Sequence, residues 1–138
     1  MLHLYSRGCE YAIQALTHLS RRECRDGFSV RSVCRKAALP ESFTRKIFQT
    51  LVKNGILAAK RGPGGGYRFK KDPDKISLLS MIHAIDGKRA FDKCVIKDIP
   101  CDRTERCSLH SKWMKTKDSL IKQLADSTIA QLIIEEGI

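Results

Sequence analysis

The chain has 138 residues, of which 42% are hydrophobic and 30% are charged, and its formal net charge at pH 7 is +11. This length predicts about one domain. No apolar run is long enough to cross a membrane, and Met1–Arg7 lacks the apolar stretch of a signal peptide, so we expect a cytoplasmic protein with reduced thiols and no membrane partner.

The positive charge is unevenly distributed along the chain. Residues 1–90 contain 18 Lys and Arg against 7 Asp and Glu, whereas residues 91–138 contain 8 of each kind. The whole excess therefore lies in the first two thirds of the chain. This asymmetry indicates a polyanionic partner, with DNA or RNA favoured over a membrane surface. A basic face that only keeps the protein soluble is the alternative, and charge alone does not decide between the two.

Three helices are predicted in the first part of the chain. The first extends from about Ser6 to Leu19, where apolar residues recur at helical spacing and form one buried stripe. The polar segment Ser20–Phe28 is expected to be a loop. Ser29 can cap a second helix, Val30–Ala38, and a third helix extends from about Glu41 to Asn54.

The second and third helices form a helix-turn-helix pattern, because a tight turn joins them and the outer face of the third is basic. In such proteins the second helix of the pair lies in the DNA major groove. An ordinary helical hairpin with solvated charges is the alternative. The predicted inner face comprises Phe43, Ile47, Phe48 and Leu51. The predicted base contacts come from Ser42, Phe43 and Arg45, and the phosphate contacts from Lys46, Lys53, Lys60 and Arg68.

A β-hairpin wing is predicted after these helices. Ile56–Lys60 and Tyr67–Lys70 read as short strands, and the sequence between them is Arg-Gly-Pro-Gly-Gly-Gly. Glycines allow positive φ angles and a close approach to another molecule. A phosphate-binding ATPase loop would need Lys-Ser or Lys-Thr after its last glycine, where this chain has Tyr67. Arg61 is placed to enter a minor groove, and a backbone phosphate contact, or none, is the alternative.

The remaining elements are helical. Lys71–Lys75 is a connector, and Ser77 is expected to cap a helix that ends at about Asp86. A long helix from about Leu109 to Ala125 carries a large apolar side, and a short helix follows through Ile134. Pairing of the long helix with its copy would make a two-fold dimer suited to a palindromic DNA site. The alternative is that this helix folds back on its own domain.

Three cysteines, Cys94, Cys101 and Cys107, lie within fourteen residues of one another, and His110 follows three positions later. Pro100 and the dense charges between the cysteines disfavour a regular helix or a buried strand. Thiolates and an imidazole at this density suit zinc or an iron–sulfur cluster. A disulfide loop, or reduced cysteines without a ligand, are the alternatives.

The motifs together resemble the Rrf-type transcriptional regulators, which include IscR-, NsrR-, RirA- and CymR-like members. The similarity covers essentially the whole chain. It is carried by Tyr5–Ile13, Leu51–Leu57, Lys60–Tyr67 and the three cysteines. The resemblance implies a homodimeric regulator whose iron–sulfur cluster changes its affinity for palindromic double-stranded DNA, in response to iron status, oxygen or redox state, or nitric oxide.

The resemblance also suggests the cluster ligands. Cys94, Cys101 and Cys107 correspond to the three thiolate ligands. His110 matches a Cys-x-x-His arrangement found with 2Fe–2S clusters, and we favour it as the fourth ligand. Glu10 matches an acidic ligand that other members supply from the partner subunit to 4Fe–4S clusters. The alternatives are that His110 only caps or packs, and that Glu10 is a favourable anion at a helix N-terminus.

The sequence therefore predicts a mainly α fold with a small β-hairpin wing, a winged helix-turn-helix followed by a long C-terminal dimerisation helix. The expected divisions are a DNA-binding domain at 1–70, a connector and helix at 71–90, a cluster-binding loop at 91–108 and a dimerisation region at 109–138. No acid–base pair or substrate cleft indicates an enzyme. A zinc-structured or cluster-free regulator of the CymR type and, less readily, an iron–sulfur electron-transfer protein are the competing functions.

Overall fold

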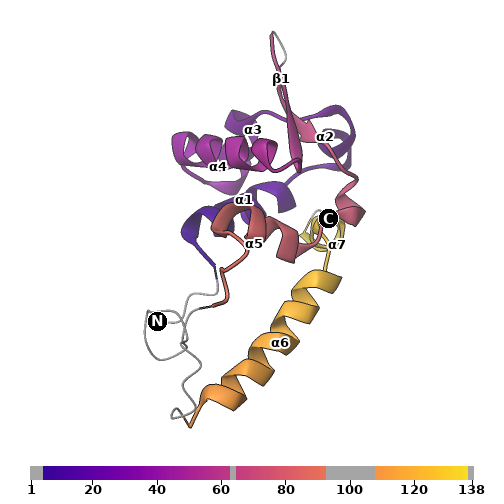
Figure 1. Ribbon diagram of the computed structural model, residues 1–138. Coiled ribbons are helices and arrows are strands. Elements are labelled where there is room, and N and C mark those ends of the chain that lie inside the picture. The colour runs from indigo at the N-terminus through magenta and orange to yellow at the C-terminus, as the bar shows by residue number, and fades with distance from the viewer. Residues whose placement is uncertain (1–4, 63–64, 93–107, 137–138) are drawn as a thin grey trace.

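The computed structural model describes residues 5–62, 65–92 and 108–136. The elements are α1 (Arg7–Thr17), α2 (Arg21–Asp26), α3 (Val30–Ala37), α4 (Glu41–Lys53), β1 (Leu57–Lys60), β2 (Gly66–Phe69), the 3-10 helix η1 (Pro73–Lys75), α5 (Leu78–Asp86), α6 (His110–Asp126) and α7 (Ile129–Glu136). The hairpin projects from one end of the molecule and α6 extends from the other (Figure 1). The predicted fold class, mainly helical with a β-hairpin wing, is confirmed.

Serine side chains begin several of the predicted helices. The Ser6 hydroxyl accepts a hydrogen bond from the backbone N–H of Cys9 at 3.1 Å, and Ser29 and Ser77 accept equivalent bonds at the starts of α3 and α5. Each bond satisfies a backbone donor that the first helical turn leaves without a partner. The predicted caps Ser29 and Ser77 are therefore confirmed.

The prediction of a loop at Ser20–Phe28 was wrong, because most of this segment forms α2. The Ser20 hydroxyl accepts a hydrogen bond from the Glu23 N–H at 3.1 Å, and a Glu23 carboxylate oxygen accepts one from the Ser20 N–H at 3.0 Å. This reciprocal capping box stabilises the first turn of a short helix that has no buried residue. The Ser-x-x-Glu spacing was the signal in the sequence.

Phe48 lies at the centre of the packing between α4 and the wing. Its side chain is fully buried, and its ring meets those of Phe28 at 5.9 Å and Tyr67 at 5.4 Å in edge-to-face arrangements. Phe43 was predicted on the same inner face but is 41% exposed, and Thr44 is buried instead. Helical spacing alone did not show which of these two neighbours faces inward.

The wing is a two-stranded antiparallel hairpin in which Leu57 pairs with Phe69 and Lys60 with Gly66. Phe28 adds a further rung, because its backbone N–H and C=O bond those of Tyr67 at 2.8 and 2.7 Å. A Cβ atom at Gly66 would lie 2.3 Å from the Phe28 carbonyl oxygen. The close approach that requires glycine here is therefore made by the protein's own backbone.

The C-terminal helices pack against the rest of the chain. Ile129 and Ile133 of α7 are buried in the main core, and the N–H of Ile129 bonds the Ile76 carbonyl at 2.9 Å. In α6, Leu120, Ile121 and Leu124 pack on a second cluster formed by Cys9, Ile82 and Phe91. These α6 side chains are half-buried in the single chain, and pairing of α6 with a copy stays a prediction.

Within the described residues, no helix combines the length and the apolar character needed to span a bilayer.

Candidate nucleic-acid interface

The polar side of α4 carries the residues predicted to contact DNA. Burial of Thr44, Phe48 and Leu51 fixes which side of the helix faces the core. The opposite side presents Ser42, Phe43, Arg45, Lys46, Gln49 and Lys53, all exposed. One helix thus brings the predicted base-reading and phosphate-contacting residues onto one accessible surface.

Arg45 forms an ion pair with Glu41, a residue that the sequence analysis did not single out. Its Nη2 atom donates to Glu41 Oε1 at 2.7 Å, one helical turn earlier. The other carboxylate oxygen of Glu41 lies 3.9 Å from Arg31 Nε on α3. Glu41 therefore joins the two helices of the helix-turn-helix unit and limits the orientations of the Arg45 guanidinium, the group suited to guanine.

Phe43 offers an apolar contact at the beginning of α4. Its ring packs edge-to-face on Tyr11 of α1, with ring centroids 5.6 Å apart and an interplanar angle of 89°. Phe43 is partly exposed, and in the chain it stands between Ser42 and Arg45, which are also exposed on α4. An apolar side chain in this position can contact the methyl group of thymine.

The wing adds a second group of cations. Lys60, Arg61 and Arg68 are exposed, and Lys60 and Arg61 stand at the end of β1, where the hairpin projects (Figure 1). Arg61 precedes Gly62, whose φ of 93° lies in the left-handed region favoured by glycine. Since β1 packs against α4, the wing cations lie beside the α4 surface.

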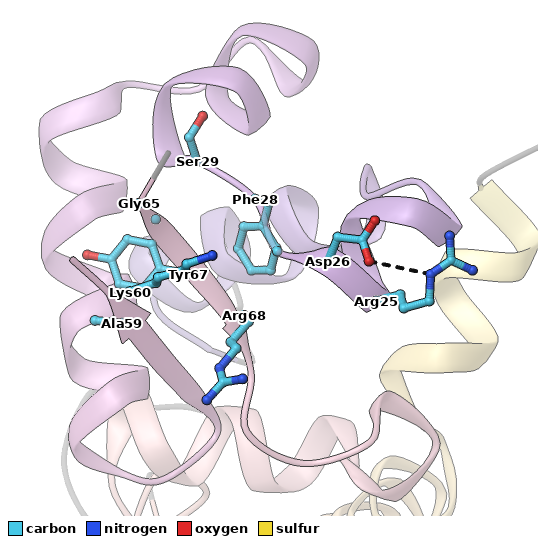
Figure 2. A pocket seen from close by; sticks show the side chains of 11 residues that line it. Arg25, Asp26, Phe28, Ser29, Ala59, Lys60, Gly65, Tyr67 and Arg68 are labelled. Atoms are coloured by element: carbon cyan, nitrogen blue, oxygen red, sulfur yellow. Dashed lines mark ion pairs between the residues drawn. The ribbon is translucent and has the colours of Figure 1, made fainter. Parts of the chain in front are cut away.

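A groove of about 520 Å³ lies between α2 and the wing. Figure 2 shows Lys60 and Tyr67 of the wing on one side, Arg25 and Asp26 of α2 on the other, and Arg68 between them. Arg25 was not predicted to take part in a site, because its segment was interpreted as a loop. The Ser20–Glu23 capping box was the signal in the sequence that indicated a helix here.

The three predicted thiolate ligands, Cys94, Cys101 and Cys107, lie outside the described residues. His110 is the first residue of α6 and is half-buried. Glu10 is exposed in the first turn of α1 and accepts a hydrogen bond from Gln14 Nε2 at 3.4 Å. The N-terminal end of α6 lies far from α1 (Figure 1), so one chain does not bring His110 and Glu10 together. Over residues 5–62, 65–92 and 108–136 there is no group of three His, Cys, Asp or Glu that could hold a metal ion.

The remaining cysteines have the surroundings of packing residues. Cys9 is fully buried, and burial, followed by the charge of Asp86, raises the pKa of its thiol to about 12. Burial and then the Glu23 carboxylate raise the pKa of the half-buried Cys24 thiol, against the effect of Lys36. Cys34 is buried in the main core. Since metals bind the thiolate form, these residues suit a ligand role poorly.

We expect Cys9 to resist alkylation in the folded protein. A pKa near 12 instead of 9.0 leaves roughly a thousandfold less thiolate at neutral pH. Iodoacetamide at pH 8, followed by peptide mass mapping, should modify Cys24 first and Cys9 only after denaturation in urea. Equal alkylation rates at Cys9 and Cys24 in the folded protein would contradict the buried, high-pKa environment of the Cys9 thiol.

Comparisons with known proteins agree with this geometry. Residues 5–135 match the profile of the Rrf2 family, described as an iron-dependent transcriptional regulator. The HTH-type transcriptional regulator IscR of Serratia proteamaculans is 27% identical over 99% of this chain and 82% of its own length, and that of Erwinia tasmaniensis is 29% identical with the same coverage.

Solved structures share the fold. CymR, the global cysteine regulator of B. subtilis, superposes with a TM-score of 0.76 at 20% identity, over 98% of both chains. T. potens IscR superposes with a TM-score of 0.71 at 22% identity, over 94% of this chain and 85% of its own.

Proposed function

This chain belongs to the Rrf2 family of transcriptional regulators, and on that premise we propose that it is a homodimeric, iron–sulfur-dependent regulator of palindromic operators. The family consists of DNA-binding regulators and not of enzymes, so its partner is DNA. The observation that carries the proposal is the exposed basic face of α4 beside a cationic wing.

The described residues support a division of roles at the DNA. Ser42, Phe43 and Arg45 would contact base edges, because they share the accessible side of α4. Arg61 would enter the minor groove from the wing. The phosphate contacts would come from Lys46, Lys53, Lys60 and Arg68, and they would make affinity depend on salt.

The donor set fits an iron–sulfur centre held by Cys94, Cys101 and Cys107 with His110 as fourth ligand, which favours a 2Fe–2S cluster. Such a group supplies a site that responds to iron supply, oxidants and nitric oxide. Glu10 is the alternative fourth ligand. By the family resemblance, a centre that uses Glu10 would take it from the second subunit and favour 4Fe–4S.

A contact between α5 and α1 links the cysteine segment, which follows α5, to α4, the predicted recognition helix. Asp86 ends α5, just before that segment, and its carboxylate accepts hydrogen bonds from the N–H of Ser6 at 2.8 Å and from the Ser6 hydroxyl. Helix α1 in turn packs on α4, since a Cβ on Gly8 would lie 2.7 Å from Ile47 Cδ1. A signal that changes the balance between two arrangements of the segment therefore has a physical route to α4.

The proposal is tested by purifying the protein without oxygen and measuring iron, acid-labile sulfide and zinc. We expect a coloured protein with iron and sulfide, which the triple variant Cys94→Ala/Cys101→Ala/Cys107→Ala loses. The triple variant should also differ from the wild type by about tenfold or more in operator affinity, the range of ordinary coupling energies.

Two further variants identify the fourth ligand. His110→Ala should lower iron content if His110 binds the cluster, whereas Glu10→Ala should then leave it unchanged. A colourless protein that contains zinc instead would indicate a zinc-structured regulator. Operator binding that is identical in the wild type and the triple variant would exclude control through these cysteines.

A further inference from the structure

We propose that the groove between α2 and the wing binds the DNA backbone, so that each protomer contacts phosphates beyond those reached by α4 and the wing tip. The inference rests on the proposed DNA-binding function and adds to it a contact surface that includes Arg25. Two properties of the groove support it: its shape and its charge.

The shape follows from the alternation of side chains along β2. Tyr67 and Phe69 pack on Phe48 and Phe28, so Arg68 between them projects from the other face of the hairpin. Residues directly opposite each other in an antiparallel pair share a face. Arg68 is opposite Ala58, and Lys60 is opposite Gly66. Lys60 and Arg68 thus lie on one face of the hairpin, and the Phe28–Ser29 backbone, which approaches Gly66, forms part of the groove lining beside them.

The opposite side of the groove adds a third cation. Arg25 lies on α2 with its side chain 76% exposed, and its Nε is 3.5 Å from Asp26, which is also 3.6 Å from Arg22. One carboxylate therefore faces two arginines. Exposed pairs of this kind contribute little, so Arg25 is free to exchange Asp26 for a phosphate. Among the described residues, Lys60 and Arg68 form no ion pair.

The lining is mixed, because the half-buried ring of Tyr67 stands beside the charged side chains. Cations on both walls, Arg25 on α2 and Lys60 and Arg68 on the wing, match a polyanion that passes alongside the hairpin (Figure 2).

The test uses the salt dependence of binding to a duplex that the full-length wild-type protein enriches from a random pool. Each phosphate contact contributes about 0.9 to the slope of log Kobs against log salt. We expect Arg25→Ala/Arg68→Ala to reduce the magnitude of the slope by about 2 for each bound protomer, against about 1 for Arg68→Ala alone, and to shorten the hydroxyl-radical footprint. The enriched sequence should remain the same, because backbone contacts carry no base information.

The matched control is Lys112→Ala/Lys122→Ala, which removes two exposed charges from α6, distant from the wing. It should keep the wild-type slope, and thermal melting should show both double variants folded. The inference is overturned if Arg25→Ala/Arg68→Ala lowers the slope no further than Arg68→Ala alone, or if it enriches a different sequence. If the wild type itself enriches no duplex, the proposed DNA-binding function has failed, and that outcome is distinct from failure of the groove alone.

Discussion

Replacing Phe48 with alanine is expected to destabilise the protein by about 3–5 kcal/mol, as large truncations of buried aromatic residues do. Phe48 is fully buried and joins α4 to both Phe28 and Tyr67. Its removal would leave a cavity between the recognition helix and the wing. Since whole domains are stable by only about 5–15 kcal/mol, this loss is a large fraction of the total stability. Urea denaturation followed by circular dichroism measures the loss.

Phe43→Ala is the matched control, since it removes the same side chain from the same helix at a position that is 41% exposed. Its ring contact with Tyr11 contributes about 0.5–1.5 kcal/mol beyond area burial, and its smaller buried area keeps the expected loss below that of Phe48→Ala. Phe43→Ala should remain folded and should still weaken DNA binding, because it loses a base contact. Equal destabilisation by the two substitutions would show that Phe48 is not the centre of this core.

Gly66→Ala is expected to cost about 1–3 kcal/mol, the usual range for overpacking. The added Cβ would lie 2.3 Å from the Phe28 carbonyl oxygen and 3.3 Å from Ser29 Cα, which are backbone atoms that cannot rotate away. The wing must then move relative to the start of α3. We expect DNA affinity to fall by about tenfold or more, the equivalent of one good base contact.

The control for Gly66 is Gly55→Ala. Nothing lies within 4 Å of a Cβ built at Gly55, but its φ of 77° is strained for alanine, so about 1–2 kcal/mol should be lost without displacement of the wing. Fluorescence anisotropy with a selected duplex, together with urea denaturation, separates the two effects. Unchanged DNA affinity in a folded Gly66→Ala protein would rule out the proposed role of wing position.

Local sequence signals were sufficient for most of the fold. The caps Ser29 and Ser77, the apolar stripe of α1 and the glycine-rich hairpin each depend on neighbours in the chain, and all were predictable. The helix α2 also had a local signal, but the polar composition of its segment outweighed the Ser-x-x-Glu spacing. The exposure of Phe43 depends on how α1 meets α4, which periodicity does not specify.

The residue types of the site could be predicted from the sequence, whereas their arrangement in space could be predicted only in part. The basic face of α4 follows from helical spacing, but the contact of Glu41 with both Arg45 and Arg31 depends on the angle between two helices. The groove beside Arg25 likewise needs α2 to be placed against the wing. For the cysteines, the ligand types follow from the sequence, whereas the bound group and the choice between His110 and Glu10 remain predictions.

The bridge between Ser77 and Thr128 fastens the beginning of α5 to the beginning of α7, and the Leu78 N–H bonds the Ser127 carbonyl at 2.9 Å. The two ends of the span from residue 78 to residue 127 are thereby held side by side. Helix α5 within that span belongs to the body that carries α4, because Met81 lies in the main core. Since α7 is fastened beside Ser77, a change of length between α5 and α6 would leave α7 anchored at the same point of the core. Such an attachment would let relatives of this chain differ between these two helices while they keep the same DNA-reading body.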